Sequence, residues 1–310
     1  MSRDFRNRAS FRSALSFHRF LRHLHLPHVA ADKVVQTLKV LRNPADVLRR
    51  RRAGQTIRRQ ATTKIRISES EGWLPLGIDE LSGQSEASEA CRVIFEEKKK
   101  SGESEEVLAA ANKNFLVSLV RDEQFGPHEK VLELVLSDEV LNAAATYLGS
   151  LPLLTALRLW WTPPNTSAES SQLYHFDAEG TRQLKFFFNV LEVGPENGPF
   201  HLIPASHSKT IAKQLGYRRG KLSDSTLEPF EIETHRKILT GRAAVGAAVD
   251  TSRCLHLGSR SNLRERVVLM MQFTPLSCPR VARPDWVGMK MTPAFKNRLS
   301  PLAISALGLK

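Results

Sequence analysis

The sequence predicts a mainly β fold, an antiparallel barrel or jelly roll packed against a layer of helices. Between about residues 84 and 149 the apolar residues follow a helical pattern. After Gly149 the pattern changes to short β-branched or aromatic runs separated by Pro, Gly, Asn and Ser. Helices followed by many short strands are typical of a β core covered by helices. The chain of 310 residues, 41% of them hydrophobic, is long enough to bury such a core.

The clearest expected helix spans residues 137–148. Ser137 can cap its start, the acidic residues that follow suit the positive end of the helix dipole, and Gly149 can end it. Two further helices are expected at residues 86–100 and 105–120.

Six runs are expected to form strands. They are Leu154–Trp161, Gln172–Asp177, Leu184–Val193, Phe200–Ile203, Ala243–Val249 and Arg266–Thr274. Their large aromatic residues are expected to lie chiefly in the core, although alternate side chains of a barrel strand must face its interior. These are Trp160, Trp161, Phe186 and Phe188.

The positive charge is concentrated at the N-terminus. Residues 1–60 contain 13 Arg and 2 Lys against three Asp, a net charge of +12, whereas the whole chain carries +13. We therefore expect a basic, partly disordered arm at 1–60, one domain at 61–290 with its β core at about 151–275, and a C-terminal tail at 291–310. With its charge set apart from the core, the arm is expected to be dispensable for chemistry.

The arm is interpreted first as a solvated extension, because blocks of like charge are usually tails. Apolar and basic residues also alternate at helical spacing between Phe11 and Leu24, before Pro27, and a weaker helical stretch covers residues 32–41. Weak contact with a polyanion, either anionic lipid or nucleic acid, and an organelle transit peptide remain alternatives.

Membrane-spanning and disulfide-rich proteins are excluded by two features. No apolar run reaches the roughly 18 residues of a spanning helix, because Arg158 interrupts the best candidate. The three cysteines are scattered, with neither CxxC spacing nor the density of a disulfide scaffold. We expect a reducing, cytoplasmic location.

A candidate metal site begins at Tyr174-His175-Phe176-Asp177. In a strand, His175 and Asp177 project from the same face. One imidazole and one carboxylate make part of a facial triad, which takes its third ligand from a second His and leaves other positions open for substrate and oxygen. His256, after a small-residue strand and before Gly258, is the leading candidate. An HxD pattern alone also occurs by chance, so its context matters.

That context resembles the phytanoyl-CoA dioxygenase-like family of Fe(II)- and 2-oxoglutarate-dependent oxygenases. The first matching stretch, residues 171–208, reads SQLYHFDAEGTRQLKFFFNVLEVGPENGPFHLIPASHS. The second, residues 254–275, reads CLHLGSRSNLRERVVLMMQFTP. The resemblance implies a double-stranded β-helix of the jelly-roll type, iron on His175, Asp177 and His256, and an Arg that binds 2-oxoglutarate.

The Arg has a physical reason of its own. When 2-oxoglutarate chelates a metal through its keto acid end, its second carboxylate needs a partner, and a guanidinium can pair with it through two hydrogen bonds. Arg266 stands at the family's position, ten residues after His256. Arg264 shares the face under strand alternation and stays open as an alternative, whereas Arg260 is interpreted as a solvated loop residue. Lys185 is expected as a second cation at the cosubstrate, and Arg158 could add further positive charge to the site.

The sequence therefore predicts an Fe(II)/2-oxoglutarate-dependent dioxygenase that hydroxylates a small organic molecule and releases succinate and CO2, with O2 as the other cosubstrate. Two alternatives are a non-catalytic jelly-roll module that keeps the metal site and a protein that acts on a nucleic acid or membrane through its arm. The substrate and the oligomeric state have no recognisable code in the sequence.

Overall fold

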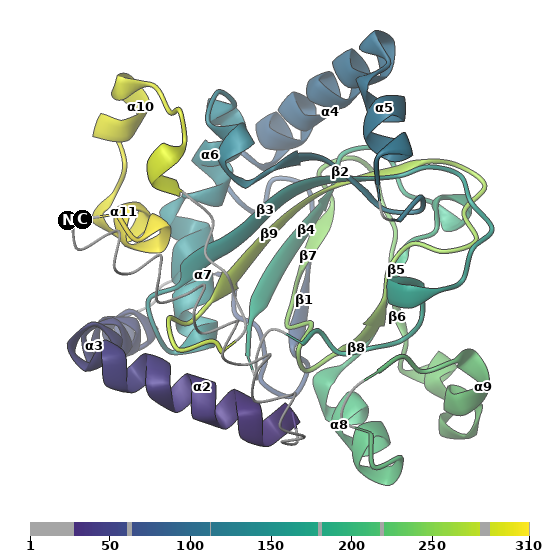
Figure 1. The fold of residues 1–310 in the computed structure, drawn as a ribbon, viewed down its shortest axis with the longest axis horizontal. Helices are drawn as coiled ribbons and strands as arrows, with labels where there is room; N and C mark the ends of the chain where they lie inside the picture. The colour runs from purple at the N-terminus through teal and green to yellow at the C-terminus, as the bar shows by residue number, and fades with distance from the viewer. Residues whose placement is uncertain are drawn as a thin grey trace.

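A computed structural model describes residues 28–60, 64–111, 113–178, 182–217, 220–279 and 286–309. Two antiparallel sheets face each other (Figure 1). In the order of pairing, the larger sheet consists of β1 (Trp73–Leu76), β7 (Gly246–Val249), β4 (Leu184–Asn189), β9 (Arg266–Thr274), β3 (Leu153–Thr162) and β2 (Val117–Arg121). The smaller sheet consists of β6 (Lys237–Leu239), β5 (Phe200–Ile203) and β8 (Leu255–Leu257). The prediction of a jelly-roll β core with flanking helices is confirmed.

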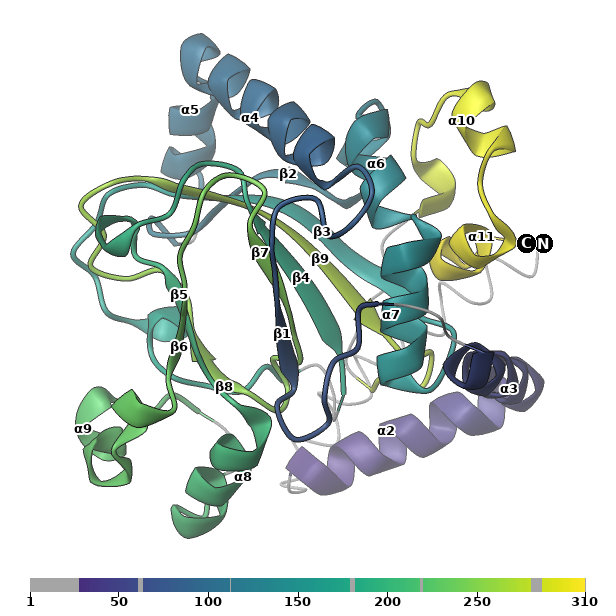
Figure 2. The ribbon, with the colours of Figure 1, turned by 180° about the vertical axis from the view of Figure 1, so that it is seen from behind.

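Helices surround the sheets, and the view from behind shows the same layers (Figure 2). The N-terminal half contains α2 (His28–Arg42), α3 (Pro44–Gln60), α4 (Gln84–Ser101), α5 (Glu103–Ala109), α6 (Glu129–Val135) and α7 (Asp138–Leu148). The C-terminal half contains α8 (Ala205–Gln214), α9 (Asp224–Leu227), α10 (Pro293–Asn297) and α11 (Pro301–Leu307). None of the described helices is long and apolar enough to cross a membrane.

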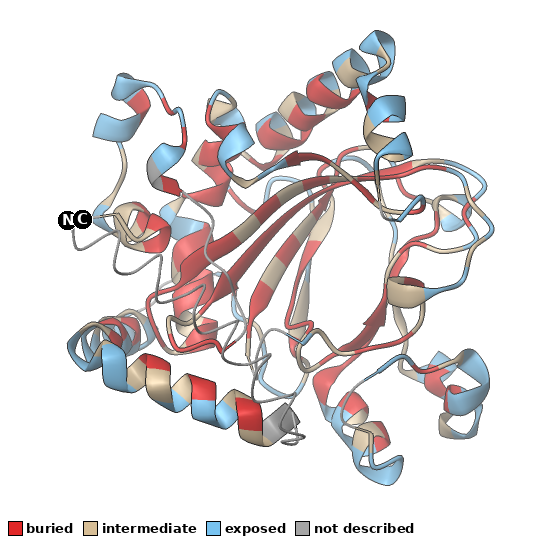
Figure 3. Ribbon diagram, viewed as in Figure 1, coloured by how far each residue is buried: buried red, intermediate tan, exposed pale blue. Residues whose placement is uncertain are grey.

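The main core lies between the larger sheet and its helical layer (Figure 3). Phe186, Phe188 and Trp161 point into it, where they meet residues of α4, α6 and α7. Alternate residues of the same strands, such as Phe187, face the smaller sheet and pack against Phe200. Central strand β9 is buried along its whole length. The space between the two sheets is therefore lined by the side chains that alternate with the core residues.

Two expected elements differ from the structure. Residues 105–120 do not form one helix, because α5 ends at Ala109 and Val117–Arg121 forms edge strand β2 against β3. Residues 172–177 do not form a regular strand, although Tyr174 and His175 each make an isolated bridge. In the first segment, pairing with β3 overrides the local helical pattern.

The described part of the arm, residues 28–60, consists of two helices that pack on the body, and the first of them covers the helical stretch expected at residues 32–41. Helix α3 lies against α7, and Arg50, which is 4% exposed, donates to the carbonyls of Pro152 and Ser305 at 3.5 and 2.8 Å. Lys39 of α2 donates to the Cys278 carbonyl at 2.6 Å. These contacts join residues 28–60 to the body, and the dispensability of the arm for chemistry stays a prediction. The helix expected between Phe11 and Leu24 lies outside the described residues.

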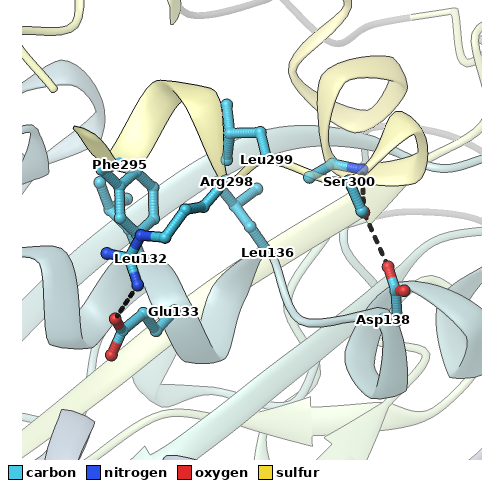
Figure 4. A pocket seen from close by; sticks show the side chains of 9 residues that line it. Leu132, Glu133, Leu136, Asp138, Phe295, Arg298, Leu299 and Ser300 are labelled. Carbon is cyan, nitrogen blue, oxygen red and sulfur yellow. Dashed lines mark hydrogen bonds and ion pairs between the residues drawn. The ribbon is translucent and has the colours of Figure 1, made fainter. Parts of the chain in front are cut away.

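The expected C-terminal tail is also part of the packed body. Ala303, Ala306 and Leu307 of α11 belong to the main core. Beside them, a cavity of about 240 Å³ separates α6 and α7 from α10 and α11, and polar contacts span it (Figure 4). Arg298 pairs with Glu133 at 3.4 Å, and Ser300 donates to Asp138 at 2.7 Å.

The contact between α3 and α7 generates a stability prediction. A methyl group added at Gly54 would overlap the backbone of Ser150. Gly→Ala in a helix ordinarily stabilises by about 1 kcal/mol, but here overpacking is expected to lower the free energy of unfolding by about 1–3 kcal/mol. Urea unfolding of Gly54→Ala checks this, with exposed Gln55→Ala as the control. A Gly54→Ala protein as stable as the wild type would contradict this packing.

Candidate metal centre

Backbone pairing brings the three expected ligands together. The residue 173–177 segment runs beside β8, and His175 and His256 exchange reciprocal N–H to carbonyl hydrogen bonds of 2.9 and 3.0 Å. Two residues further on, the Asp177 N–H donates to the Thr251 carbonyl at 2.9 Å. The three side chains offer ligand atoms that all lie within 4.8 Å of one another. Among the described residues, this is the one group of three or more His, Cys, Asp or Glu with such spacing.

Hydrogen bonds set the orientation of both imidazoles. The Nδ1 atom of His175 lies 2.8 Å from the Leu173 carbonyl, and that of His256 lies 3.0 Å from the Cys254 carbonyl. Because a carbonyl only accepts, each Nδ1 carries the hydrogen and each Nε2 of a neutral ring keeps its lone pair. Both Nε2 atoms lie 3.7 Å from Asp177 Oδ1. The lone pairs of the two rings therefore converge on one carboxylate oxygen.

The charge states also suit a cation. Burial, with a further contribution from His256, lowers the pKa of His175 to about 3, and burial lowers the pKa of His256. Burial alone would raise the pKa of Asp177, but Lys185 and other neighbours outweigh it and hold that pKa well below its usual range. At neutral pH the site thus presents two neutral imidazoles and one carboxylate. This donor set fits a divalent transition metal.

The second oxygen of Asp177 has its own partners. Lys185 Nζ lies 2.6 Å from Oδ2, and Gln183 Nε2 lies 3.2 Å from the same atom. Gln183 Nε2 also donates to Thr251 Oγ1 at 2.7 Å. No pattern in the sequence singles out Gln183 or Thr251, since neither belongs to the HxD motif. Lys185, expected from the sequence to lie at the cosubstrate, pairs with the Asp177 carboxylate.

Aromatic side chains line the space next to the triad. The Phe200 ring stacks on His256, with centroids 5.4 Å apart, and Phe187 lies 5.0 Å from Phe200. Phe187 and Phe200 belong to an apolar cluster that bridges the two sheets and includes Val249 and partly buried Trp73. Neither Phe was singled out from the sequence, because a run of three Phe does not reveal which one faces the interior.

The structure separates the two candidate arginines. Arg266, the first residue of β9, is 8% exposed, and its guanidinium forms no hydrogen bond or ion pair with any described residue. Burial lowers its pKa to about 10, so it stays charged at neutral pH. The side chain of Arg264 is 74% exposed and pairs with Glu196 at 3.0 Å. The sequence-based preference for Arg266 thus agrees with the burial of its side chain. Arg264 lies in the loop before β9, where the alternation of side chains in a strand does not apply.

The other expected cations have partners of their own. Arg158 pairs with Asp122 at the start of the 3-10 turn Asp122–Phe125, and Arg260 pairs with Asp224 at 2.7 Å. Of Arg158, Arg260 and Arg266, Arg266 is therefore the one that has no charged partner among the described residues.

No protein-family model matches the sequence, and no curated protein matches it. Solved structures do. EctD from S. alaskensis, with 2-oxoglutarate and 5-hydroxyectoine, is 16% identical over 75% of this chain and 90% of its own, with a TM-score of 0.48. AviO1 from Streptomyces viridochromogenes Tue57 is 14% identical over 66% and 90%, with a TM-score of 0.44. The epimerase SnoN, in complex with Fe3+, alpha ketoglutarate and nogalamycin RO, is 17% identical over 72% and 83%, with a TM-score of 0.43.

Proposed function

We propose that this protein is an Fe(II)/2-oxoglutarate-dependent dioxygenase that hydroxylates a small organic molecule and releases succinate and CO2. The observation that carries the proposal is the convergence of His175, Asp177 and His256, whose free donor atoms point at one another from three backbone segments. A triad of this composition leaves coordination positions for a bidentate keto acid and for O2. A non-catalytic module that keeps the metal is the alternative, and succinate formation distinguishes the two.

In this proposal the triad, Arg266 and two aromatic side chains have separate roles. The triad would hold Fe(II), which supplies the electrons that activate O2. Arg266 would pair with the distal carboxylate of 2-oxoglutarate, because a fixed guanidinium fork matches a carboxylate and keeps its charge when buried. Phe187 and Phe200 would keep water away from the reacting atoms. The substrate class stays open, because no further side-chain pattern in the described interior identifies a substrate.

We further propose a cytoplasmic location. Cys91 and Cys254 are free thiols and are buried, and burial raises the pKa of both above the usual thiol range. Unpaired thiols of this kind suit a reducing compartment.

Removal of one ligand tests the metal site. His256→Ala is expected to abolish stoichiometric Fe(II) binding and succinate formation, because two remaining protein donors are too few to hold the ion. Anaerobic Fe(II) titration and succinate release measure the two effects. His207→Ala, on α8 and outside the triad, serves as the control and should match the wild type. Full Fe(II) affinity and turnover in His256→Ala would assign the third ligand elsewhere.

The two arginines give a second test. Arg266→Ala should raise the 2-oxoglutarate requirement steeply while Fe(II) stays bound, because truncating one member of a buried charge pair costs on the order of 2–5 kcal/mol. Arg264→Ala should change it little, since its side chain is exposed. A 2-oxoglutarate titration of both variants checks the ranking, and the reverse ranking would reassign the role to Arg264.

We also propose that the arm contacts a polyanion, an anionic lipid surface or a nucleic acid. Supporting this, Arg51, Arg52 and Arg59 are exposed on α3, and their guanidinium groups form no hydrogen bond or ion pair with a described residue. Phosphates would pair with them in a salt-dependent way.

Charge reversal tests this contact. Arg52→Glu with Arg59→Glu should weaken binding to phosphatidylserine liposomes and to a short DNA duplex at low salt. The matched control, Lys209→Glu with Lys213→Glu on exposed positions of α8, makes the same change in net charge elsewhere. If the wild type binds neither polyanion at low salt, the arm has no partner of this kind.

A further inference from the structure

We infer that Lys185 is the internal counter-ion of the metal-free site and that its charge weakens the hold of the site on a divalent cation. The inference rests on the proposed function in one respect, that Asp177 is a metal ligand. It departs from the sequence-based expectation, in which Lys185 contacts 2-oxoglutarate.

The position of Lys185 supports a counter-ion. It is the second residue of β4, opposite Gln272 of β9 and Val249 of β7, on the strand face that points toward the smaller sheet. Its ammonium lies 2.6 Å from Asp177 Oδ2, and the two side chains are 13% and 15% exposed. Because a buried carboxylate needs a charged or hydrogen-bonding partner, and the two imidazoles are neutral, Lys185 supplies the compensating charge.

The same charge opposes a cation. The Lys185 ammonium lies 2.6 Å from Asp177 Oδ2, and Oδ1 of the same carboxylate lies 3.7 Å from both imidazole Nε2 atoms. A divalent ion between His175, His256 and Asp177 would therefore lie close to a like charge. Lys185 therefore stabilises the metal-free protein and disfavours the metal-bound one.

Loss of Lys185 should not disorient Asp177, and this determines the sign of the effect. Lys185 holds Oδ2, whereas Oδ1 faces both imidazoles. Gln183 Nε2 also holds Oδ2, and the Asp177 backbone is fixed by its bond to Thr251. A residue that only oriented a ligand would weaken metal binding when removed, on the order of 10- to 100-fold. Removing a nearby like charge from a site that stays oriented should tighten it.

The experiment titrates the metal-stripped full-length protein with Co(II), which needs no turnover. Lys185→Gln, which keeps a hydrogen-bond donor without the charge, and Lys185→Met are both expected to bind Co(II) at least about tenfold more tightly than the wild type. Both should also melt at a lower temperature without metal and recover when Co(II) is added. Lys185→Arg keeps the charge and should match the wild type.

The control is Lys99→Met, because Lys99 also pairs with a carboxylate, that of Glu265 at 3.2 Å, but on the surface. It should leave Co(II) affinity unchanged. Unchanged or weaker Co(II) binding by both neutral Lys185 variants would overturn the inference. So would an unchanged Co(II) affinity combined with a raised 2-oxoglutarate requirement, which would restore Lys185 to the cosubstrate. A wild type that binds Co(II) but forms no succinate would instead refute the proposed activity and leave the inference standing.

Discussion

The candidate site depends on one pair of backbone hydrogen bonds, those exchanged between His175 and His256. They join the segment before β4 to β8, and they bring two imidazoles that are 81 residues apart in the sequence to a ring separation of 4.3 Å. The carbonyls at Leu173 and Cys254, each two residues before its imidazole, then fix which nitrogen faces inward. The side chains are thus oriented by the backbone itself, so the geometry exists before any metal arrives.

The side chains on one face of β4 belong to the main core, and those on the other face lie on the side of the candidate site. Phe186 and Phe188 complete the core beneath the helical layer, while Lys185 and Phe187 face the smaller sheet. A register shift of one residue would exchange these sets and place the charge of Lys185 in the main core. Because β4 lies between β7 and β9 and is hydrogen-bonded to both, such a shift is prevented. The register of β4 therefore fixes the positions of Lys185 and Phe187 together with those of the core residues Phe186 and Phe188.

Local patterns predicted the long elements well. The expected helix at 137–148 begins with the Ser137 cap and ends at Gly149 in the left-handed conformation, and strands β3 and β9 lie where the apolar runs are. Short elements escaped because three- or four-residue strands such as β8 and β1 have too few residues to show a period. The packing of Arg50 and Gly54 against the body follows from the fold and could not be predicted from the charge count of the arm. The HxD motif located two of the three candidate ligands, whereas the partners of Asp177 follow from the fold alone.

The burial of Arg266 without a partner among the described residues links folding to small molecules. A buried guanidinium without a partner destabilises the folded chain, so any anion that pairs with it only in the folded state shifts the folding equilibrium toward that state. The shift grows with the logarithm of the anion concentration once the site is saturated. If Arg266 binds a carboxylate as proposed, the lifetime of this chain in the presence of proteases should track the supply of that carboxylate, and its abundance would report on that metabolite.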